Sequence, residues 1–503
     1  MLALAIYLSF AGALLVALLP ASRPTLVRWT ALSVAAAGLA VALIGFFSAA
    51  GQGRQVLVDI SWVPAMGIHY LLAADGISRV LVLLTGIAAV SGVLFSWTIS
   101  ERVNQFFAFY FALIGGVYGV FLSFDLFLLF VFYEIAIVPK YFLIAIWGST
   151  RREYGAMKLA LYSFAGSAIV LIGLLAAYTT SGVRSTSLDA LAHAHLTAAT
   201  QMWLFPLVFT GFAILAGMWP FHTWAPTGHV AAPTAASMLL AGVVMKLGAY
   251  GCLRVAMVLF PAGLLPWGFS VLGLGSWRDV FALLAVIGIV YGALVALVQT
   301  DFKFVIGYSS VSHMGFVILG LMTLNQLGLQ GAVLQMFSHG VIAGLLFAIV
   351  GRIVYERTHT RQLAELETMH LSRRLPFAAW AFVVAGMASM GLPGFSGFVA
   401  ELQILIGSWQ MNPLWIILTG VGIVLGVAYT WRALQKAFFS DLHPGAHPDP
   451  DSSGEQALAA ITWPEVAGVA LLLFATLAVG LYPRILLDSI APAVRDLLAG
   501  GVQ

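Results

Sequence analysis

Six ionisable side chains stand inside stretches of sequence that are otherwise apolar, and their types could carry protons. They are Glu134, Lys140, Lys246, His313, His339 and Glu401. A charged side chain at the centre of a bilayer costs about 2.5–3.5 kcal/mol, so such residues mark ion or proton pathways by default. A carboxylate beside a lysine holds the lysine protonated, and loss of that carboxylate favours release of the proton. Histidine titrates near neutrality and suits the intermediate positions of a relay.

Each of these residues also has a purely structural interpretation. A lysine near a helix end can extend its stem to the headgroups, but Lys246 has apolar or small residues on both sides for several turns. Glu134 and Glu401 could be structural carboxylates, and His313 and His339 could be neutral side chains bonded to a neighbouring helix. His222 and His229 could cap backbone at a helix break. We expect Lys303, which follows Asp301 at the start of a span, to be an interface residue.

The composition places the chain in the class of polytopic helical membrane proteins. Of its 503 residues, 61% are hydrophobic and 9% are charged, and its apolar runs are long enough to cross about 30 Å of hydrocarbon as helices. A net charge of +3 gives no indication of nucleic-acid binding. A single cysteine excludes disulfides and cysteine-ligated iron–sulfur clusters within this chain. We therefore expect no metal or redox cofactor here.

About fourteen spans are predicted, and basic residues are more frequent on one side of them. The spans are 2–20, 27–50, 78–98, 106–122, 125–147, 158–180, 201–224, 232–258, 279–297, 303–323, 329–353, 377–408, 413–436 and 464–483. With the first terminus outside, the positive-inside rule is satisfied and both termini lie outside. Arg79 and Arg254 are then counted among the few basic residues of the outer side. The segment QVLVDISWV, in the loop before the third span, alternates as a strand of an outer hairpin does. The hydrophilic stretch 443–455 predicts a cytoplasmic connection.

The seventh and twelfth spans contain residues that interrupt helices, at 217–226 and 391–397. In lipid, unwound backbone persists only where protein or water satisfies it, and paired breaks in two halves indicate an inverted-repeat transporter. We expect an all-α membrane protein with two inverted five-helix repeats, spans 4–8 and 9–13. The single transmembrane domain, 1–503, then divides into four parts. They are N-terminal helices with an outer hairpin (1–105), two half-channel repeats (106–258 and 279–436), and a connection with a last helix (437–503).

Long motifs throughout the chain resemble those of the antiporter-like subunits of respiratory complex I. They are ADGIS, PFHTW, APTAASMLLAGVVMKLGAYG, TDFKFVIGYSSVSHMGF and GLPGFSGFVAE. Within that family the chain is most similar to the M type. The L and N types carry a lysine on the twelfth span where this chain has Glu401, and the L type continues into a long lateral helix.

The resemblance implies roles for the buried residues. Glu134 would be the carboxylate of the first half-channel, Lys246 the central lysine, His313 and His339 relay histidines, and Glu401 the terminal residue. One departure stands out, because the family has a lysine on the seventh span where this chain has Leu215. The aspartate of the family's next motif is also missing from the segment WAPTGH.

Lys140 is a candidate replacement for the missing lysine. It follows Pro139 and lies six residues after Glu134, about 9 Å along a helix. Pairing would lower the cost of burying its charge. The alternative is that Lys140 extends to the cytoplasmic headgroups near Arg151.

We therefore expect a proton-translocating membrane-arm subunit of a complex I-type NADH:quinone oxidoreductase, in the inner membrane of a bacterium. Quinone reduction in other subunits would supply the energy, and antiporter-like subunits of the L and N types would be its neighbours in the lipid bilayer. The first alternative is a subunit of a related membrane-bound hydrogenase or of an Mrp-type cation/proton antiporter. The second is a non-pumping scaffold, disabled by the loss of the seventh-span lysine.

Overall fold

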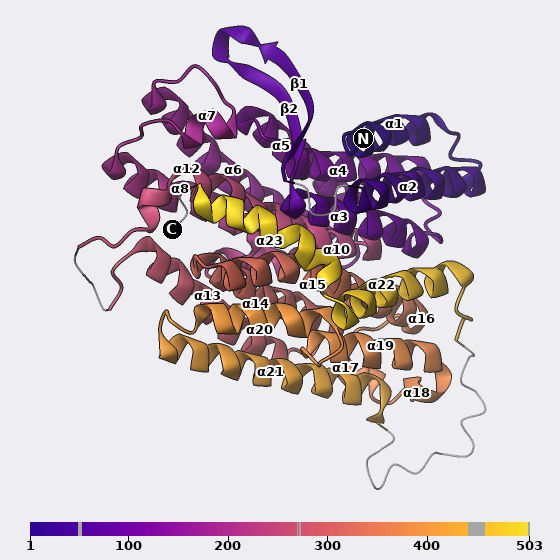
Figure 1. The fold of residues 1–503 in the computed structure, drawn as a ribbon. Coiled ribbons are helices and arrows are strands. Elements are labelled where there is room, and N and C mark those ends of the chain that lie inside the picture. Colours follow the sequence, from indigo (N-terminus) through magenta and orange to yellow (C-terminus); the bar gives the residue numbers. More distant parts are fainter. Residues whose placement is uncertain (49–52, 269, 271–272, 441–457, 501–503) are drawn as a thin grey trace, which may run out of the picture.

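The protein is a bundle of long helices from which a two-stranded hairpin projects (Figure 1). The structure is a computed structural model that describes residues 1–48, 53–268, 270, 273–440 and 458–500. The predicted connection 443–455 lies outside these residues. The first half of the chain forms the upper part of Figure 1, and the orange helices of the second half lie below it.

The helices agree with the spans predicted from hydropathy. In the first half they are α1 (Leu4–Leu18), α2 (Pro24–Phe47), α3 (Gly76–Phe95), α4 (Val103–Leu122), α5 (Leu126–Trp147), α6 (Arg152–Ser181), α7 (Leu188–Ala192), α8 (Ala198–Ala216), α9 (Trp224–Ala231), α10 (Thr234–Leu239), α11 (Met245–Gly251) and α12 (Met257–Leu259). In the second half they are α13 (Trp277–Val298), α14 (Phe302–Met322), α15 (Gln326–Ala348), α16 (Glu356–Thr358), α17 (Leu363–Leu366), α18 (Leu371–Arg374), α19 (Pro376–Ser389), α20 (Ser396–Ser408), α21 (Pro413–Phe438), α22 (Trp463–Leu481) and α23 (Arg484–Ala499).

Shorter turns complete the helical elements. The 3₁₀ turns are η1 (Pro64–Met66), η2 (Phe221–Thr223) and η5 (Pro261–Leu264), and the π-helical turns are η3 (Leu240–Val244), η4 (Cys252–Ala256) and η6 (Ile349–Tyr355). The eighth span is one continuous helix, Thr234–Leu259, in which η3 and η4 flank the α-helical turns that carry Lys246.

Polar side chains at span entrances begin several of these helices. Asp75 accepts a hydrogen bond from the backbone N–H of Ser78 at 2.9 Å at the start of α3, and Asp125 accepts one from Leu128 at 3.0 Å at the start of α5. Asp301 accepts one from Lys303 at 2.8 Å at the start of α14. Such N-caps satisfy backbone donors that an apolar environment would leave unpaired.

The predicted outer hairpin is present. Strand β1 (Gln55–Val63) pairs antiparallel with β2 (Ile68–Ala74). Gly67 closes the turn between them with φ of 65°, a left-handed conformation that glycine adopts without strain. The strand predicted in QVLVDISWV is therefore confirmed.

Both predicted helix breaks are also confirmed. The seventh span stops at Gly217, where φ is +79°, and resumes through η2 and α9. The twelfth span is divided into α19 and α20, with Gly391 and Gly394 at φ of +69° and +97° between them. Backbone groups at both breaks are satisfied within the protein: the N–H of Met218 donates to the carbonyl of Ala213, and the N–H of Leu392 donates to that of Met387.

The lengths of the helices do not confirm the predicted number of fourteen spans. In the described part of the chain, twelve helices are long and apolar enough to cross a membrane. The first predicted span is the shorter helix α1, and the twelfth is the pair α19 and α20. Fourteen spans and two inverted repeats therefore stay predictions.

Three helices form the centre of the bundle. They are α3, the eighth span and α15, and each is buried along its whole apolar length. α3 packs against α10 and α15, and α15 also contacts α22 and α23. The centre of the fold therefore carries two of the predicted residues, Lys246 and His339.

Helix α23 was not expected from the sequence. It lies obliquely over α3 and α15 in Figure 1, with Leu486, Ile490, Val494 and Leu497 buried on one face. These residues recur at helical spacing, but the segment is too polar for a hydropathy criterion to detect as a span.

Candidate functional site

Lys246 lies at the centre of the bundle and is fully buried. Its ammonium donates a hydrogen bond to the backbone carbonyl of Ala241, in the π-helical turn η3. Its Nζ also lies 2.8 Å from Nδ1 of His339 on α15. Because π-helical turns change the direction of side chains and backbone carbonyls, they occur often at functional sites. Here the turn supplies a partner for a lysine that has no helix end within reach.

The contact with His339 continues to two more ionisable residues. The rings of His339 and His313 are stacked, with centroids 5.3 Å apart and an interplanar angle of 16°. Nε2 of His313 lies 3.6 Å from Oε1 of Glu401. Four of the six predicted residues, here called the central row, therefore lie in one sequence: Lys246, His339, His313 and Glu401.

The second helix break holds the far end of the central row. His313 Nδ1 is 2.8 Å from the carbonyl of Ser309, one turn earlier in α14, and its Nε2 is 3.2 Å from the carbonyl of Ser389. Ser389 is the last residue of α19. The break thus leaves a free carbonyl that helps to orient the imidazole.

Glu401 is placed beside the same break by a glycine and an amide. A Cβ added to Gly391 would lie 2.6 Å from Oε2 of Glu401, so a larger residue there would displace the carboxylate from this position. Nε2 of Gln335 donates a hydrogen bond of 3.4 Å to Oε1 of Glu401. Carboxylate, imidazole and ammonium groups in sequence can exchange protons but hold no redox chemistry.

The other two predicted residues, Glu134 and Lys140, are separate from the central row. Lys140 is 1% exposed. Its Nζ and the Oε1 of Glu134 are buried with no hydrogen-bond partner among the described residues. The lysine therefore does not extend to the headgroups near Arg151, as the alternative required. Leu215, at the position of the missing lysine, is 1% exposed and part of the hydrophobic core.

One interpretation of the sequence is that His229 caps the first helix break, and the structure does not show such a cap. Its ring is fully buried, and neither ring nitrogen has a hydrogen-bond partner in the part of the chain that the structure describes. The ring faces Phe347 on α15 at a centroid distance of 5.2 Å. His222 is likewise 2% exposed, with its ring 5.2 Å from that of Tyr291.

Lys303 is more deeply placed than the sequence suggested. It is 3% exposed, and its Nζ donates hydrogen bonds to the carbonyl of Ala232 at 2.9 Å and to Oγ of Ser237 at 3.3 Å. Lys303 nevertheless lies at the start of α14, as the sequence indicates, and its assignment as an interface residue stays a prediction. Ala232 lies between α9 and α10, so the lysine reaches back to the gap between the seventh and eighth spans.

A buried ion pair at the start of α3 was missed. Arg254, in the π-helical turn η4, pairs with Asp75 and lies over the ring of Phe124 at 4.9 Å from its centroid. Burial raises the pKa of Asp75, but the guanidinium and the N–H of Ser78 outweigh it and hold that pKa below its usual value. Arg254 is only 8% exposed. The signal was the motif ADGIS, which places an acid at a helix start.

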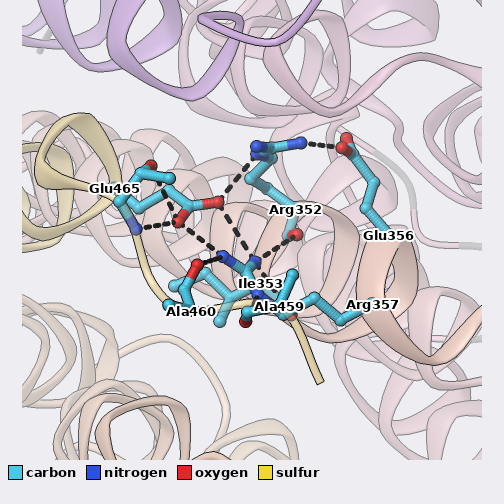
Figure 2. Close-up of polar contacts among 8 residues, drawn as sticks. Arg352, Ile353, Glu356, Arg357, Ala459, Ala460 and Glu465 are labelled. Carbon is cyan, nitrogen blue, oxygen red and sulfur yellow. Dashed lines mark hydrogen bonds and ion pairs between the residues drawn. The ribbon is translucent and has the colours of Figure 1, made fainter. Parts of the chain in front are cut away.

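A second cluster joins the end of the eleventh span to α22 (Figure 2). Glu465 accepts from Arg352 Nε at 2.9 Å and from Arg357 at 2.7 Å. Arg352 also pairs with Glu356, and Arg357 donates to the carbonyls of Ala459 and Ala460 at 2.8 Å each. A count of the basic residues on each side of the membrane could not predict this cluster. It holds the start of α22 against the end of the eleventh span.

Proton carriers are present, but no metal site is apparent. Within the described ranges, no group of three or more His, Cys, Asp or Glu residues is close enough to hold a metal ion. The predicted residues that the structure brings into contact are those of the central row.

Comparison with known proteins identifies the family. The model of the family "NADH:quinone oxidoreductase/Mrp antiporter, TM" matches residues 123–426. The chain is 36% identical to NADH-quinone oxidoreductase subunit M of Rhodobacter capsulatus, over 94% of this chain and 90% of the relative. It is also 36% identical to NAD(P)H-quinone oxidoreductase chain 4 1 of Synechococcus elongatus, over 99% and 91%.

Solved structures agree with this assignment. A chain of respiratory complex I from Thermus thermophilus with bound NADH matches at 25% identity, with a TM-score of 0.88 and full coverage of both chains. A chain of the Mrp complex from Dietzia sp. matches at 21% identity and a TM-score of 0.85, over 100% of this chain and 99% of that one, which shows a shared fold. This chain therefore belongs to the NADH:quinone oxidoreductase/Mrp antiporter family, as a multi-pass membrane subunit homologous to subunit M of NADH-quinone oxidoreductase.

Proposed function

We propose that the chain is the proton-translocating M-type subunit in the membrane arm of a bacterial complex I-type NADH:quinone oxidoreductase. The observation that supports this most is the central row, because Lys246, His339 and His313 lie in successive contact and end at Glu401. Quinone reduction in other subunits supplies the free energy. This chain contributes groups that hold and pass protons, and it needs no cofactor of its own.

The central row passes protons between groups of different chemistry. A protonated Lys246 gives its proton to the neighbouring imidazole of His339. The stacked His313 is next and faces Glu401 at the second helix break. Glu401 then delivers the proton to the outer face or to an adjacent subunit. Each step moves one proton between a nitrogen or oxygen base and its neighbour, and water can bridge the wider gaps.

Glu134 and Lys140 belong to the first half-channel, where their charges regulate proton transfer. Both side chains carry buried polar atoms without partners among the described residues. A buried charge of this kind is retained where it is functional. In this proposal Lys140 takes over the role of the lysine that Leu215 replaces, and residues 106–258 and 279–436 are the two half-channels.

The setting of this subunit follows from its relatives. We assign it to the inner membrane of a bacterium, beside antiporter-like subunits of the L and N types. The fold that it shares with a chain of the Mrp complex keeps a cation/proton antiporter subunit as the second candidate, together with a membrane-bound hydrogenase subunit. A non-pumping scaffold is the third.

Purification of the native assembly separates these candidates. A tag on this chain should bring down NADH-oxidising and quinone-reducing subunits, and vesicles holding the complex should take up protons when NADH and quinone are added. Cation-driven proton exchange without any quinone reduction would instead support the antiporter. Full pumping by a Glu401→Gln complex would support the scaffold.

A further inference from the structure

The imidazole of His313 has different partners at its two ring nitrogens. Nε2 lies 3.2 Å from the carbonyl oxygen of Ser389 and 3.6 Å from Oε1 of Glu401. That carboxylate oxygen already accepts a hydrogen bond from Nε2 of Gln335. A carbonyl oxygen and an ionised carboxylate accept hydrogen bonds and have no proton to donate. The surroundings of Nε2 therefore favour a ring that carries a hydrogen on this nitrogen.

Ser309 supplies two kinds of partner to the other nitrogen. Nδ1 of His313 is 2.8 Å from the backbone carbonyl oxygen of Ser309, which only accepts, and 3.3 Å from its Oγ, which can also donate. Nδ1 therefore has an acceptor when it carries a hydrogen and a donor when it does not. One residue can thus satisfy this nitrogen both in the imidazolium and in the neutral imidazole.

Tyr429, on α21, directs the hydroxyl of Ser309 towards the ring. The phenol OH donates a hydrogen bond of 2.9 Å to Oγ of Ser309, and the two residues are 3% and 4% exposed. A hydroxyl has one proton to donate and two lone pairs that accept. Because Oγ of Ser309 accepts from the phenol, its own proton is available to Nδ1 of His313.

The space beside the two hydroxyls is too small for a column of water. The cavity there has a volume of about 10 Å³, and its lining includes Ser309, Ser389, Tyr429 and Thr430. A cavity needs at least about 10–15 Å³ to hold one water. The hydroxyls of Ser309 and Tyr429 are therefore enclosed by packed side chains, so they are placed to orient the ring and not to lead protons to it.

We propose that Ser309 and Tyr429 are positioning residues, which hold the neutral imidazole of His313 with its hydrogen on Nε2, facing Glu401. This inference rests on the proposed function. When a proton binds to Nδ1, the new N–H donates to the carbonyl of Ser309, and the ring is an imidazolium. The N–H bond at Nε2 then breaks while an O–H bond forms on the carboxylate of Glu401. One proton enters and one leaves, the ring is neutral again, and no electrons move.

Removal of the Ser309 hydroxyl tests this role without changing an ionisable group. In Ser309→Ala the backbone carbonyl stays, so the neutral ring carries its hydrogen on Nδ1 and has none to give to Glu401. We expect proton uptake driven by quinone reduction to fall about fivefold, the factor for one lost hydrogen bond. Ser309→Thr keeps a hydroxyl and should retain most of the uptake.

The neighbouring serine provides a matched control for this substitution. Ser310 is 1% exposed, and its hydroxyl donates to the carbonyl of Ile306 in the same helix at 3.1 Å. Ser310→Ala should therefore leave proton uptake unchanged. Equal uptake by Ser309→Ala and Ser310→Ala would overturn the proposal. An equal loss in Ser309→Ala and Ser309→Thr would overturn it too, because packing and not the hydroxyl would then matter.

A second variant tests the other hydroxyl. Tyr429→Phe keeps the aromatic ring and removes only the OH that directs Ser309. We expect a smaller loss of proton uptake, about twofold, since the Ser309 hydroxyl remains and the weakest hydrogen bonds contribute about this factor. Tyr118→Phe is the control, because the Tyr118 hydroxyl is buried without a hydrogen-bond partner among the described residues. Equal uptake by the two variants would contradict the role of Tyr429.

The pH dependence of uptake separates an effect on the ring's protonation from an effect on packing. The ionisable groups that face the imidazole are Glu401 from α20, His339 from α15 and, through Ser309, Tyr429 from α21. All of them remain in Ser309→Ala, which removes a partner of the neutral ring only. The imidazolium is then favoured, so the pH of half-maximal uptake on the acid side should rise by about 0.7 unit, the equivalent of fivefold.

The outcomes distinguish this positioning role from the proposed function. A pH profile of Ser309→Ala that matches wild type would overturn the positioning role. If Lys246→Ala pumps normally, the proposed function fails. If Lys246→Ala does not pump while Ser309→Ala pumps as wild type does, only the positioning role fails.

Discussion

The buried ionisable residues of the central row and those of α5 differ in how they are connected. In the central row, Lys246 contacts His339, the two imidazoles stack, and His313 faces Glu401. On α5, Glu134 and Lys140 are buried with atoms that have no hydrogen-bond partner in the described part of the chain. A connected row can hold protons at defined distances. Unpartnered charges need water or a movement of the helix before they can act, so α5 is the place to expect regulation.

The largest effect should come from Lys246, the first residue of the central row. Lys246→Ala removes the residue that starts the transfer to His339, and the loss of one positioned acid–base group costs about a hundredfold. We expect proton uptake driven by quinone reduction to fall accordingly in vesicles. Assembly, checked by subunit content, should persist. Uptake equal to wild type at equal assembly would remove the central row from the mechanism.

Substitutions of Glu401 test the other end of the row. Glu401→Ala should lower proton uptake by up to about a hundredfold, since it deletes the terminal acid–base group. Glu401→Lys should retain more activity, because lysine still exchanges protons and related subunits use it at this position. Proton uptake by the two variants is the measurement. If alanine and lysine perform alike, the position carries no proton.

The second helix break can be perturbed without removing any ionisable group. Gly391→Ala places a Cβ 2.6 Å from Oε2 of Glu401. It also puts a side chain at a φ of +69°, which costs about 1–2 kcal/mol. We expect the carboxylate to move away from His313 and uptake to fall by roughly fivefold, the factor that corresponds to about 1 kcal/mol. Gly420→Ala, where nothing lies within 4 Å, is the control, and equal uptake by both variants would contradict this.

The smallest effect is expected on α5. Lys140→Met should reduce proton uptake by roughly twofold, as couplings through intervening residues can be as small as about 0.5 kcal/mol. Adding Leu215→Lys should restore part of the loss, since it returns a lysine to the seventh span. A Lys140→Met complex that pumps normally would show that Lys140 does not replace that lysine.

Much of the fold could be predicted because the bilayer limits the possibilities. Apolar runs must be helices, and residues such as Gly217 and Gly391 mark where helices cannot continue. The hairpin followed from the alternation in QVLVDISWV. Helix α23 escaped prediction because its apolar residues form one face only, and hydropathy averages over all faces.

The residues of the site could be predicted from the sequence better than the contacts between them. Depth in an apolar run selected Lys246, His313, His339 and Glu401, and the structure places these four in contact. Lys303 and Arg254 stand near span ends, where position along the chain does not reveal burial. Their partners, Ala232 and Asp75, come from other helices. Such contacts depend on how the helices pack against one another. This packing cannot be inferred from a single sequence.

The most direct test of the central row is a substitution of His339, which connects Lys246 to His313. In His339→Phe the aromatic ring can keep its stacking with His313, but it has no nitrogen to accept a proton from Lys246. The measurement is the number of protons taken up per quinone reduced, with purified complex in vesicles. We predict that this ratio falls while the complex assembles and the phenyl ring still packs in the place of the imidazole. A ratio unchanged from wild type would contradict proton transfer through the central row.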